Sequence, residues 1–188
     1  MIKIGITGSL ASGKTTASKI LSLKKGPLFS ADKAVKELYE NKNFKLLIRK
    51  RFKIKNNYQI KKYLKKLILG DKKNIKKLEK IIHPLVRKKM RKFTSDNKHK
   101  KFLFYEIPLL IESKLMKHFS VIIFIKAKKQ LRLMRFISKG GNKRLFNLLN
   151  NKQMKDTKKI KYSDFVVVNE NNLNILKKNL QHIIAKYE

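Results

Sequence analysis

The sequence predicts an α/β domain built on a parallel sheet, because short apolar runs alternate with longer segments of helical periodicity. The first expected strand is residues 2–7, where isoleucine occupies every second position. The later runs are continuously apolar, which is typical of parallel strands that are covered on both faces. These four runs are Leu28-Phe29-Ser30, Phe102-Leu103-Phe104-Tyr105, Val121-Ile122-Ile123-Phe124-Ile125 and Phe165-Val166-Val167-Val168.

The segment between the second and third strands is too long for a single crossover connection. It carries apolar stripes at helical spacing, the longest of them interrupted at His83-Pro84. We therefore expect one domain of 188 residues with a helical insertion. The expected core is residues 1–31, 102–131 and 156–188, the insertion about 32–101, and a small lid about 132–155.

A phosphate-binding pattern, G-x-x-x-x-G-K-[ST], follows the first strand as Gly8-Ser9-Leu10-Ala11-Ser12-Gly13-Lys14-Thr15. Strand, glycine-rich loop and helix are the context that gives this motif its meaning. We expect the backbone from Ala11 to Lys14 to surround the phosphates, with Gly8 and Gly13 allowing close approach. Lys14 would neutralise the β- and γ-phosphates, and the Thr15 hydroxyl would bind Mg²⁺. The motif predicts a P-loop NTPase three-layer fold with five parallel strands, and ATP and Mg²⁺ as cofactors.

The composition limits the possible classes of protein. There is no cysteine, which excludes disulfides, thiolate metal sites and a cysteine nucleophile. The longest apolar run is residues 121–125, too short for a signal peptide or a membrane span, so we expect a cytoplasmic location and no membrane partner. The net charge is +37, and the 42 lysines are spread along the chain. An AT-rich coding bias would explain them, although a field for polyanionic substrates or contact with nucleic acid stays open.

Two other P-loop classes fit poorly. A GTPase would need Asn-Lys-x-Asp, and the nearest string, Asn151-Lys152-Gln153-Met154, lacks the aspartate. A motor or transport ATPase would carry a strand that ends in aspartate, whereas Phe104-Tyr105-Glu106 ends in glutamate. A short chain with an early P-loop, a helical insertion and a basic segment after the fourth strand favours a small-molecule kinase.

Several further motifs resemble those of the dephospho-CoA kinase family, in the same order along essentially the whole chain. The opening Ile4-Gly5-Ile6-Thr7-Gly8, which leads into Ser12-Gly13-Lys14-Thr15-Thr16, is similar to the family's start. The other matching motifs are Ser30-Ala31-Asp32-Lys33-Ala34, Ile82-His83-Pro84-Leu85-Val86, Ile107-Pro108-Leu109-Leu110-Ile111-Glu112, Gln130-Leu131-Arg132 with Arg135, and Ser163-Asp164-Phe165-Val166-Val167-Val168-Asn169.

The resemblance implies phosphorylation of the ribose 3′-hydroxyl of dephospho-CoA by ATP. Asp32 matches the second aspartate of the family's acidic motif and would be the catalytic base, although it could instead cap a helix over residues 33–40. Arg132 and Arg135 match the start of the lid and would reach the γ-phosphate, or would lie on a solvated helix face. The nucleotide-binding residues would be Gly8, Ala11, Ser12, Gly13, Lys14, Thr15 and Thr16.

The acceptor side is implied by the remaining motifs. His83 would shape the acceptor pocket rather than take part in the chemistry. Pro108 and Leu109 would bind the acceptor, and Glu112 would either hydrogen-bond near the site or make a local structural contact. We expect a monomer that binds ATP and dephospho-CoA and no specific nucleic acid. A nucleoside or nucleotide kinase of the same fold, and a basic P-loop protein that binds nucleic acid, are the alternatives.

Overall fold

The computed structural model describes residues 1–55, 59–71 and 73–188, which form two compact units. The sheet unit comprises Met1–Ser30 and Asn97–Glu188, and the helical unit comprises Ala31–Asp96. The insertion that the sequence predicts, about 32–101, covers nearly the same residues as the helical unit. Positions 56–58 and 72 of that insertion lie outside the described residues.

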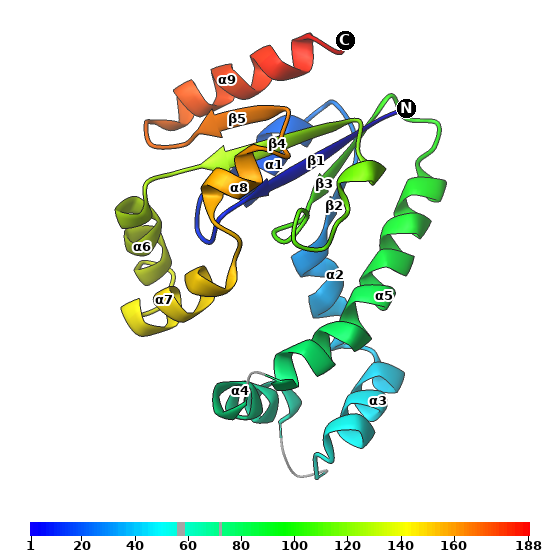
Figure 1. Ribbon diagram of the computed structural model, residues 1–188. Helices are drawn as coiled ribbons and strands as arrows, with labels where there is room; N and C mark the ends of the chain where they lie inside the picture. Colours follow the sequence, from blue (N-terminus) through cyan, green and yellow to red (C-terminus); the bar gives the residue numbers. More distant parts are fainter. Residues whose placement is uncertain (56–58, 72) are drawn as a thin grey trace. The chain divides into compact units, whose positions relative to one another are not determined.

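Five parallel strands form the sheet, in the spatial order β2-β3-β1-β4-β5 (Figure 1). The central strand is β1, in which Ile4 aligns with Phe104 on one side and Val121 on the other. The strands expected from the sequence are all present, so the predicted α/β parallel fold is confirmed. Because the strands run in the same direction, their carboxyl ends lie along one edge of the sheet. The strands are β1 (Ile2–Gly8), β2 (Leu28–Ser30), β3 (Phe102–Glu106), β4 (Val121–Lys126) and β5 (Phe165–Val168).

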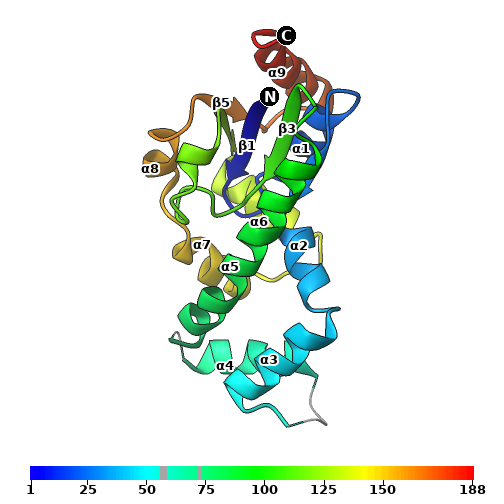
Figure 2. The same ribbon diagram turned by 90° about the vertical axis from the view of Figure 1, so that its right-hand side faces the viewer.

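Both faces of the sheet are covered, which explains the continuously apolar strands. Helices α1 (Lys14–Ser22) and α9 (Leu173–Ala185) pack together, and their apolar side chains join those of β1, β3 and β4 in one core. Helix α8 (Asp156–Ile160) lies on the opposite side of the strands from α1 (Figure 2). The connection after β3 includes a short 3₁₀ helix, η1 (Met116–His118), followed by Phe119, whose ring packs edge-on against Tyr105 of β3 with the ring centroids 5.3 Å apart.

Two short helices occupy most of the region expected as the lid. Helix α6 (Lys129–Ile137) packs against α7 (Lys143–Lys152), with the rings of Phe136 and Phe146 5.7 Å apart. Helix α7 begins after Asn142, whose side chain accepts a hydrogen bond of 2.8 Å from the backbone N–H of Leu145. This side-chain cap satisfies one of the free N–H groups at the start of the helix.

The helical unit has its own apolar core. Its helices are α2 (Ala31–Leu38), α3 (Lys42–Phe52), α4 (Ile60–Gly70) and α5 (Lys73–Asp96). Helix α5 packs against α2 and α4, and α3 packs against α4. Within the part of the chain that the structure describes, no helix is both long enough and apolar enough to span a bilayer. The buried core residues of the unit are Leu38, Phe44, Ile48, Phe52, Ile54, Ile60 and Leu64.

Two local expectations for this unit are wrong. Helix α2 begins at Ala31, so Asp32 lies in its first turn and not at the cap position that precedes a helix over residues 33–40. A carboxylate in the first turn still interacts favourably with the helix dipole. The His83-Pro84 pair does not interrupt the long apolar stripe, because α5 continues through Pro84 as one helix. Packing along the rest of α5 offsets the backbone hydrogen bond that the proline removes.

Candidate active site

The loop from Gly8 to Gly13 joins the carboxyl end of β1 to the start of α1. Gly13 has a φ of 95°, a left-handed conformation that favours glycine, and a Cβ there would clash with Nδ2 of Asn169. The Asn169 side chain donates a hydrogen bond of 2.8 Å to the Ser12 carbonyl. A Cβ on Gly8 would clash with the carbonyl oxygen of Ile125 in β4. A side chain at either motif glycine would therefore collide with a neighbouring residue.

Lys14 is the first residue of α1, and its side chain turns back across the loop. Its ammonium group donates a hydrogen bond of 2.8 Å to the Ser9 carbonyl, and the residue is only 9% exposed. An ammonium group has three donors, so it can contact more than one oxygen atom at a time. The first N–H groups of α1 and the positive end of its dipole face the same loop. Together these groups form an anion-binding cradle.

Two oxygen ligands lie next to this cradle. The Thr15 hydroxyl donates a hydrogen bond of 2.5 Å to Oε1 of Glu106, a buried residue at the carboxyl end of β3. Hydroxyl and carboxylate oxygens are the ligands that Mg²⁺ prefers, and Mg²⁺ usually binds through few protein groups together with substrate phosphates. Groups of three or more potential metal-binding side chains do not occur among the described residues. The pair therefore fits a Mg²⁺ ion that arrives with a nucleotide.

Glu106 departs from the aspartate of the ATPase pattern, and the structure places it beside Thr15. The position of Glu106 in the sequence could have predicted this contact, because Glu106 ends the strand paired with β1 and therefore lies at the same edge of the sheet as the P-loop. A carboxylate at the end of that strand fits a metal site as well as the expected aspartate does.

Arg132 of α6 is buried and bonded to backbone and amide oxygens. Its Nε donates to the Ala127 carbonyl at 3.1 Å, and its Nη1 donates to the Leu10 carbonyl at 3.3 Å and to Oδ1 of Asn150 at 2.8 Å. Burial lowers the pKa of this guanidinium, and the nearby carboxylate of Asp156 partly offsets that effect. Arg132 thus links α6 and α7 to the P-loop.

Arg135 lies one turn further along α6, beside the last residue of the loop. Its Nη1 atom is 3.9 Å from the position that a Cβ on Gly13 would occupy. This atom is buried and has no hydrogen-bond partner among the described residues, and the same holds for the Ser12 hydroxyl in the loop. Buried polar groups are normally paired. Unpaired polar groups beside an anion-binding loop therefore fit a bound phosphate ester.

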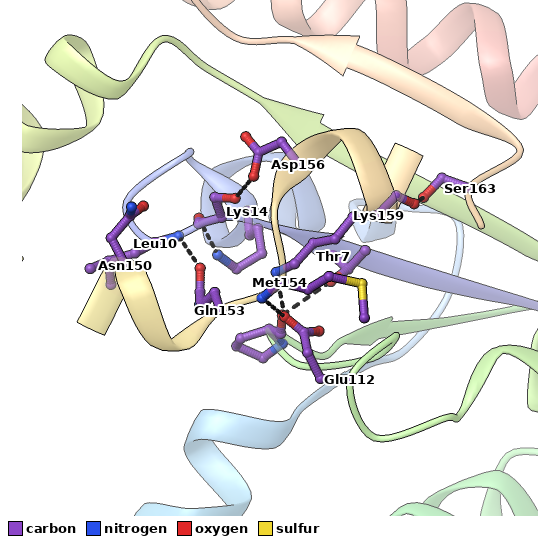
Figure 3. A network of polar contacts seen from close by, with 12 residues as sticks. Thr7, Leu10, Lys14, Glu112, Asn150, Gln153, Met154, Asp156, Lys159 and Ser163 are labelled. Atoms are coloured by element: carbon purple, nitrogen blue, oxygen red, sulfur yellow. Dashed lines mark hydrogen bonds and ion pairs between the residues drawn. The ribbon is translucent and has the colours of Figure 1, made fainter. Parts of the chain in front are cut away.

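The connection between α7 and α8 also contacts the loop (Figure 3). The side-chain oxygen of Gln153 accepts a hydrogen bond of 2.9 Å from the N–H of Leu10, and Asp156 accepts one from the Ser9 hydroxyl. The sequence motifs do not predict that Gln153 and Asp156 contact the loop. Their role became visible only when the fold brought residues more than 140 positions apart together.

The residues expected on the acceptor side divide between the two units. Pro108, Leu109 and Glu112 follow β3 in the sheet unit, where the Pro108 carbonyl accepts a hydrogen bond of 3.2 Å from the Thr7 hydroxyl. Asp32 in α2 and His83 in α5 belong to the helical unit. The structure therefore brings the predicted nucleotide-binding residues together, with Arg132 and Arg135 around them.

A parallel sheet with its P-loop after β1, two arginines from α6 beside that loop and a carboxylate at the end of β3 defines a P-loop kinase. The family model for dephospho-CoA kinase matches residues 2–174. The chain belongs to the dephospho-CoA kinase family.

Individual relatives agree with this family. The chain is 36% identical over 169 residues to the dephospho-CoA kinase of Bartonella quintana, covering 87% of each protein. It is 32% identical over 189 residues to that of Rickettsia bellii, covering 100% of this chain and 98% of the relative. The solved structure of the dephospho-CoA kinase from Campylobacter jejuni superposes with a TM-score of 0.70 at 28% identity, covering 98% of this chain and 96% of that one.

Proposed function

We propose that this protein transfers the γ-phosphoryl group of ATP to the ribose 3′-hydroxyl of dephospho-CoA and thereby forms CoA. The observation that carries this proposal is the family match over residues 2–174 in a chain that retains a complete P-loop. It favours the dephospho-CoA kinase over a nucleoside kinase and over a nucleic-acid-binding protein. We further propose that the enzyme is a monomer that acts in the cytoplasm.

Phosphoryl transfer depends mainly on positioning and on neutralisation of charge. The loop backbone from Ala11 to Gly13 would hold the β-phosphate, and Lys14 would neutralise charge on the transferred group. Thr16, in the first turn of α1, would contribute its N–H to the same phosphates. Arg135 is the better placed of the two arginines for a direct contact, because its Nη1 is buried and unpaired within the described structure. Arg132 would add positive charge while holding the Leu10 carbonyl.

Thr15 and Glu106 are the residues that would hold Mg²⁺. When bound, the ion would neutralise charge on the β- and γ-phosphate oxygens. The side chain of Glu106 is buried against Thr15, so its carboxylate would stay oriented toward the loop without a large loss of side-chain entropy on binding.

Asp32 is the proposed base that accepts the proton of the acceptor hydroxyl. It lies two residues beyond Ser30, which ends β2 and aligns with Glu106 at the carboxyl edge of the sheet. This place in the chain and its match to the family motif support the role. We propose that His83, Pro108 and Leu109 bind or shape the acceptor, and that Glu112 contributes through its Oε2 atom, which is buried without a hydrogen-bond partner in the described part of the chain.

The test is to incubate the purified protein with ATP, Mg²⁺ and dephospho-CoA and to follow CoA by mass spectrometry. Parallel reactions contain adenosine, AMP or shikimate in place of dephospho-CoA, and one reaction lacks any acceptor. We expect CoA and ADP in equal amounts only with dephospho-CoA. Turnover with another acceptor and none with dephospho-CoA would contradict the proposal.

A further inference from the structure

We propose that a buried ion pair between Lys159 and Glu112 positions the ATP-binding loop. Lys159 is fully buried in α8, and its Nζ lies 2.7 Å from Oε1 of Glu112, in the connection after β3 (Figure 3). Lysine is almost never fully buried unless it is paired, because an ammonium group loses its hydration. Because burying this charge costs free energy, we expect a contribution of the pair to the neighbouring ATP-binding loop.

Glu112 holds the α7–α8 connection at a second point. The Oε1 atom that pairs with Lys159 also accepts a hydrogen bond of 3.2 Å from the backbone N–H of Met154. One carboxylate oxygen therefore binds both the beginning of the connection and the helix that follows it. The residues between these two points are thus attached to the connection after β3 at both ends.

The α7–α8 connection and the start of α8 in turn hold Ser9 and Leu10 of the P-loop. Gln153, directly before Met154, accepts the 2.9 Å hydrogen bond from the N–H of Leu10. Asp156, at the start of α8, accepts from the Ser9 hydroxyl, and the Ser9 carbonyl accepts from Lys14 at 2.8 Å. A continuous set of contacts thus runs from the Lys159–Glu112 pair to the lysine of the P-loop.

Lys159 is a positioning residue, since its side chain is closed off from any substrate. Loss of the pair should loosen Gln153 and Asp156 and, through them, the loop that binds ATP. Lys159→Met should affect the KM for dephospho-CoA less than it affects ATP binding, whereas Glu112→Gln also removes the proposed contribution of Glu112 to the acceptor site. This inference rests on the proposed function only in taking the P-loop to bind ATP, so that binding of ATP tests it without any acceptor.

The experiment uses Lys159→Met, Glu112→Gln and the double variant. Each single variant leaves one partner unpaired and should lower the melting temperature by roughly 6–20 °C. The double variant removes both charges and should recover most of that loss. Its dissociation constant for Mg²⁺–ATP, measured by calorimetry, should nevertheless stay raised by about 10- to 100-fold, because a displacement near 1 Å is enough to disturb such a site.

An exposed ion pair in the same unit is the matched control. Lys25 pairs with Glu188, and their side chains are 43% and 41% exposed. Lys25→Met, Glu188→Gln and their double variant should leave ATP affinity and the KM for dephospho-CoA unchanged. The pair Gln153→Ala and Lys159→Met should be non-additive for ATP affinity, because both act through one connection.

The outcomes separate the alternatives. A folded double variant that binds ATP as tightly as the parent would overturn the inference, and Lys159 would then be only structural. A raised KM for dephospho-CoA with unchanged ATP affinity would also overturn it and would leave Glu112 with its proposed role at the acceptor alone. A parent protein that binds ATP but forms no CoA would contradict the proposed function alone.

Discussion

Single residues carry the nucleotide chemistry in this chain, and the structure shows what each of them is bonded to. Lys14 crosses its own loop to the Ser9 carbonyl, and Thr15 is held by Glu106. The hydrogen bond from Lys14 to a carbonyl is a single local contact with a charged donor, worth about 1.5–3 kcal/mol net. Its charge next to a phosphate is worth far more in a site from which water is excluded. A substitution of Lys14 should therefore reduce activity much more than it reduces stability.

We expect Lys14→Ala to abolish kinase activity and to leave the fold intact. The substitution removes the positive charge that neutralises the transferred phosphate. It leaves the apolar core between β1 and α1 unchanged, because the core residues of α1 are Ala17 and Leu21. CoA formation should fall by at least about 10²–10³-fold, as when one donor to a transition-state oxyanion is removed. The circular dichroism spectrum should match that of the parent. Near-normal turnover would end the P-loop interpretation.

Asp32→Asn should spare ATP binding and reduce transfer. The amide keeps the size of the side chain and can still orient the hydroxyl, but it cannot accept the proton, a role that typically contributes about 10²–10⁴-fold. The measurements are single-turnover CoA formation and calorimetry with Mg²⁺–ATP. The matched control is Asp96→Asn, at the end of α5, where the carboxylate pairs with exposed Lys92. A variant that kept more than roughly half of the parent rate would indicate that Asp32 only stabilises the start of α2.

Sequence reasoning reached most of the nucleotide site because the P-loop is one contiguous segment. Lys159 could not be found in this way, since it is one lysine among 42 and its burial arises only where α8 packs against β4. The contacts of Gln153 and Asp156 with the P-loop could not be predicted for the same reason, because their partners lie more than 140 residues earlier. Arg132 was expected on a lid or on a solvated face, and the structure buries it against Ala127 and Leu10.

At the scale of helices and strands, the five strands were predictable because each is a short apolar run between helical segments. Because they are buried on both faces, β3 and β4 are apolar or aromatic up to their last residues, Glu106 and Lys126, so the pattern is unambiguous. The helix boundaries were less predictable. The His83-Pro84 pair indicated a break, yet α5 continues through it. A local propensity of this kind is overridden when packing on both sides of the proline favours one helix.

Pro84→Ala tests how much this proline costs α5. Pro84 is exposed within the helix, so the alanine adds no new contact and restores a backbone N–H donor. We expect the free energy of unfolding of the helical unit to rise by about 1–3 kcal/mol, since proline in a helix interior is roughly 3 kcal/mol less favourable than alanine. Urea denaturation followed by circular dichroism measures the change. If the His83-Pro84 element shapes the acceptor pocket as proposed, the KM for dephospho-CoA should rise at the same time.

Exposed Lys88 on the same helix provides the control. Lys88→Ala should change neither the free energy of unfolding nor the KM for dephospho-CoA appreciably. An unchanged stability in Pro84→Ala would show that the helix already accommodates the proline without cost. A more stable variant with an unchanged KM for dephospho-CoA would remove the His83-Pro84 element from the acceptor site.

The whole molecule carries a net charge of +37, which its family membership does not require. A small-molecule kinase needs positive charge around the phosphates, and Lys14, Arg132 and Arg135 provide it near the P-loop. Most of the other lysines lie at exposed positions on the described helices. The described ion pairs of the protein are few and mostly exposed, so they offset little of this charge. The excess charge is therefore spread over exposed positions and is not concentrated at the P-loop.

The response to salt separates a general field from a nucleic-acid site. If only the charges near the P-loop and the acceptor matter, raising the salt from about 50 to 200 mM should raise the KM for dephospho-CoA only modestly, because partly buried charges are weakly screened. A protein that makes 6–10 phosphate contacts with nucleic acid would instead lose about 10³–10⁵ in affinity over that range. The measurement runs CoA formation and binding to a labelled RNA side by side over the same salt series. We expect weak RNA binding that disappears at the higher salt while turnover continues. Tight, steeply salt-dependent RNA binding without CoA formation would contradict the kinase assignment and favour a nucleic-acid-binding P-loop protein.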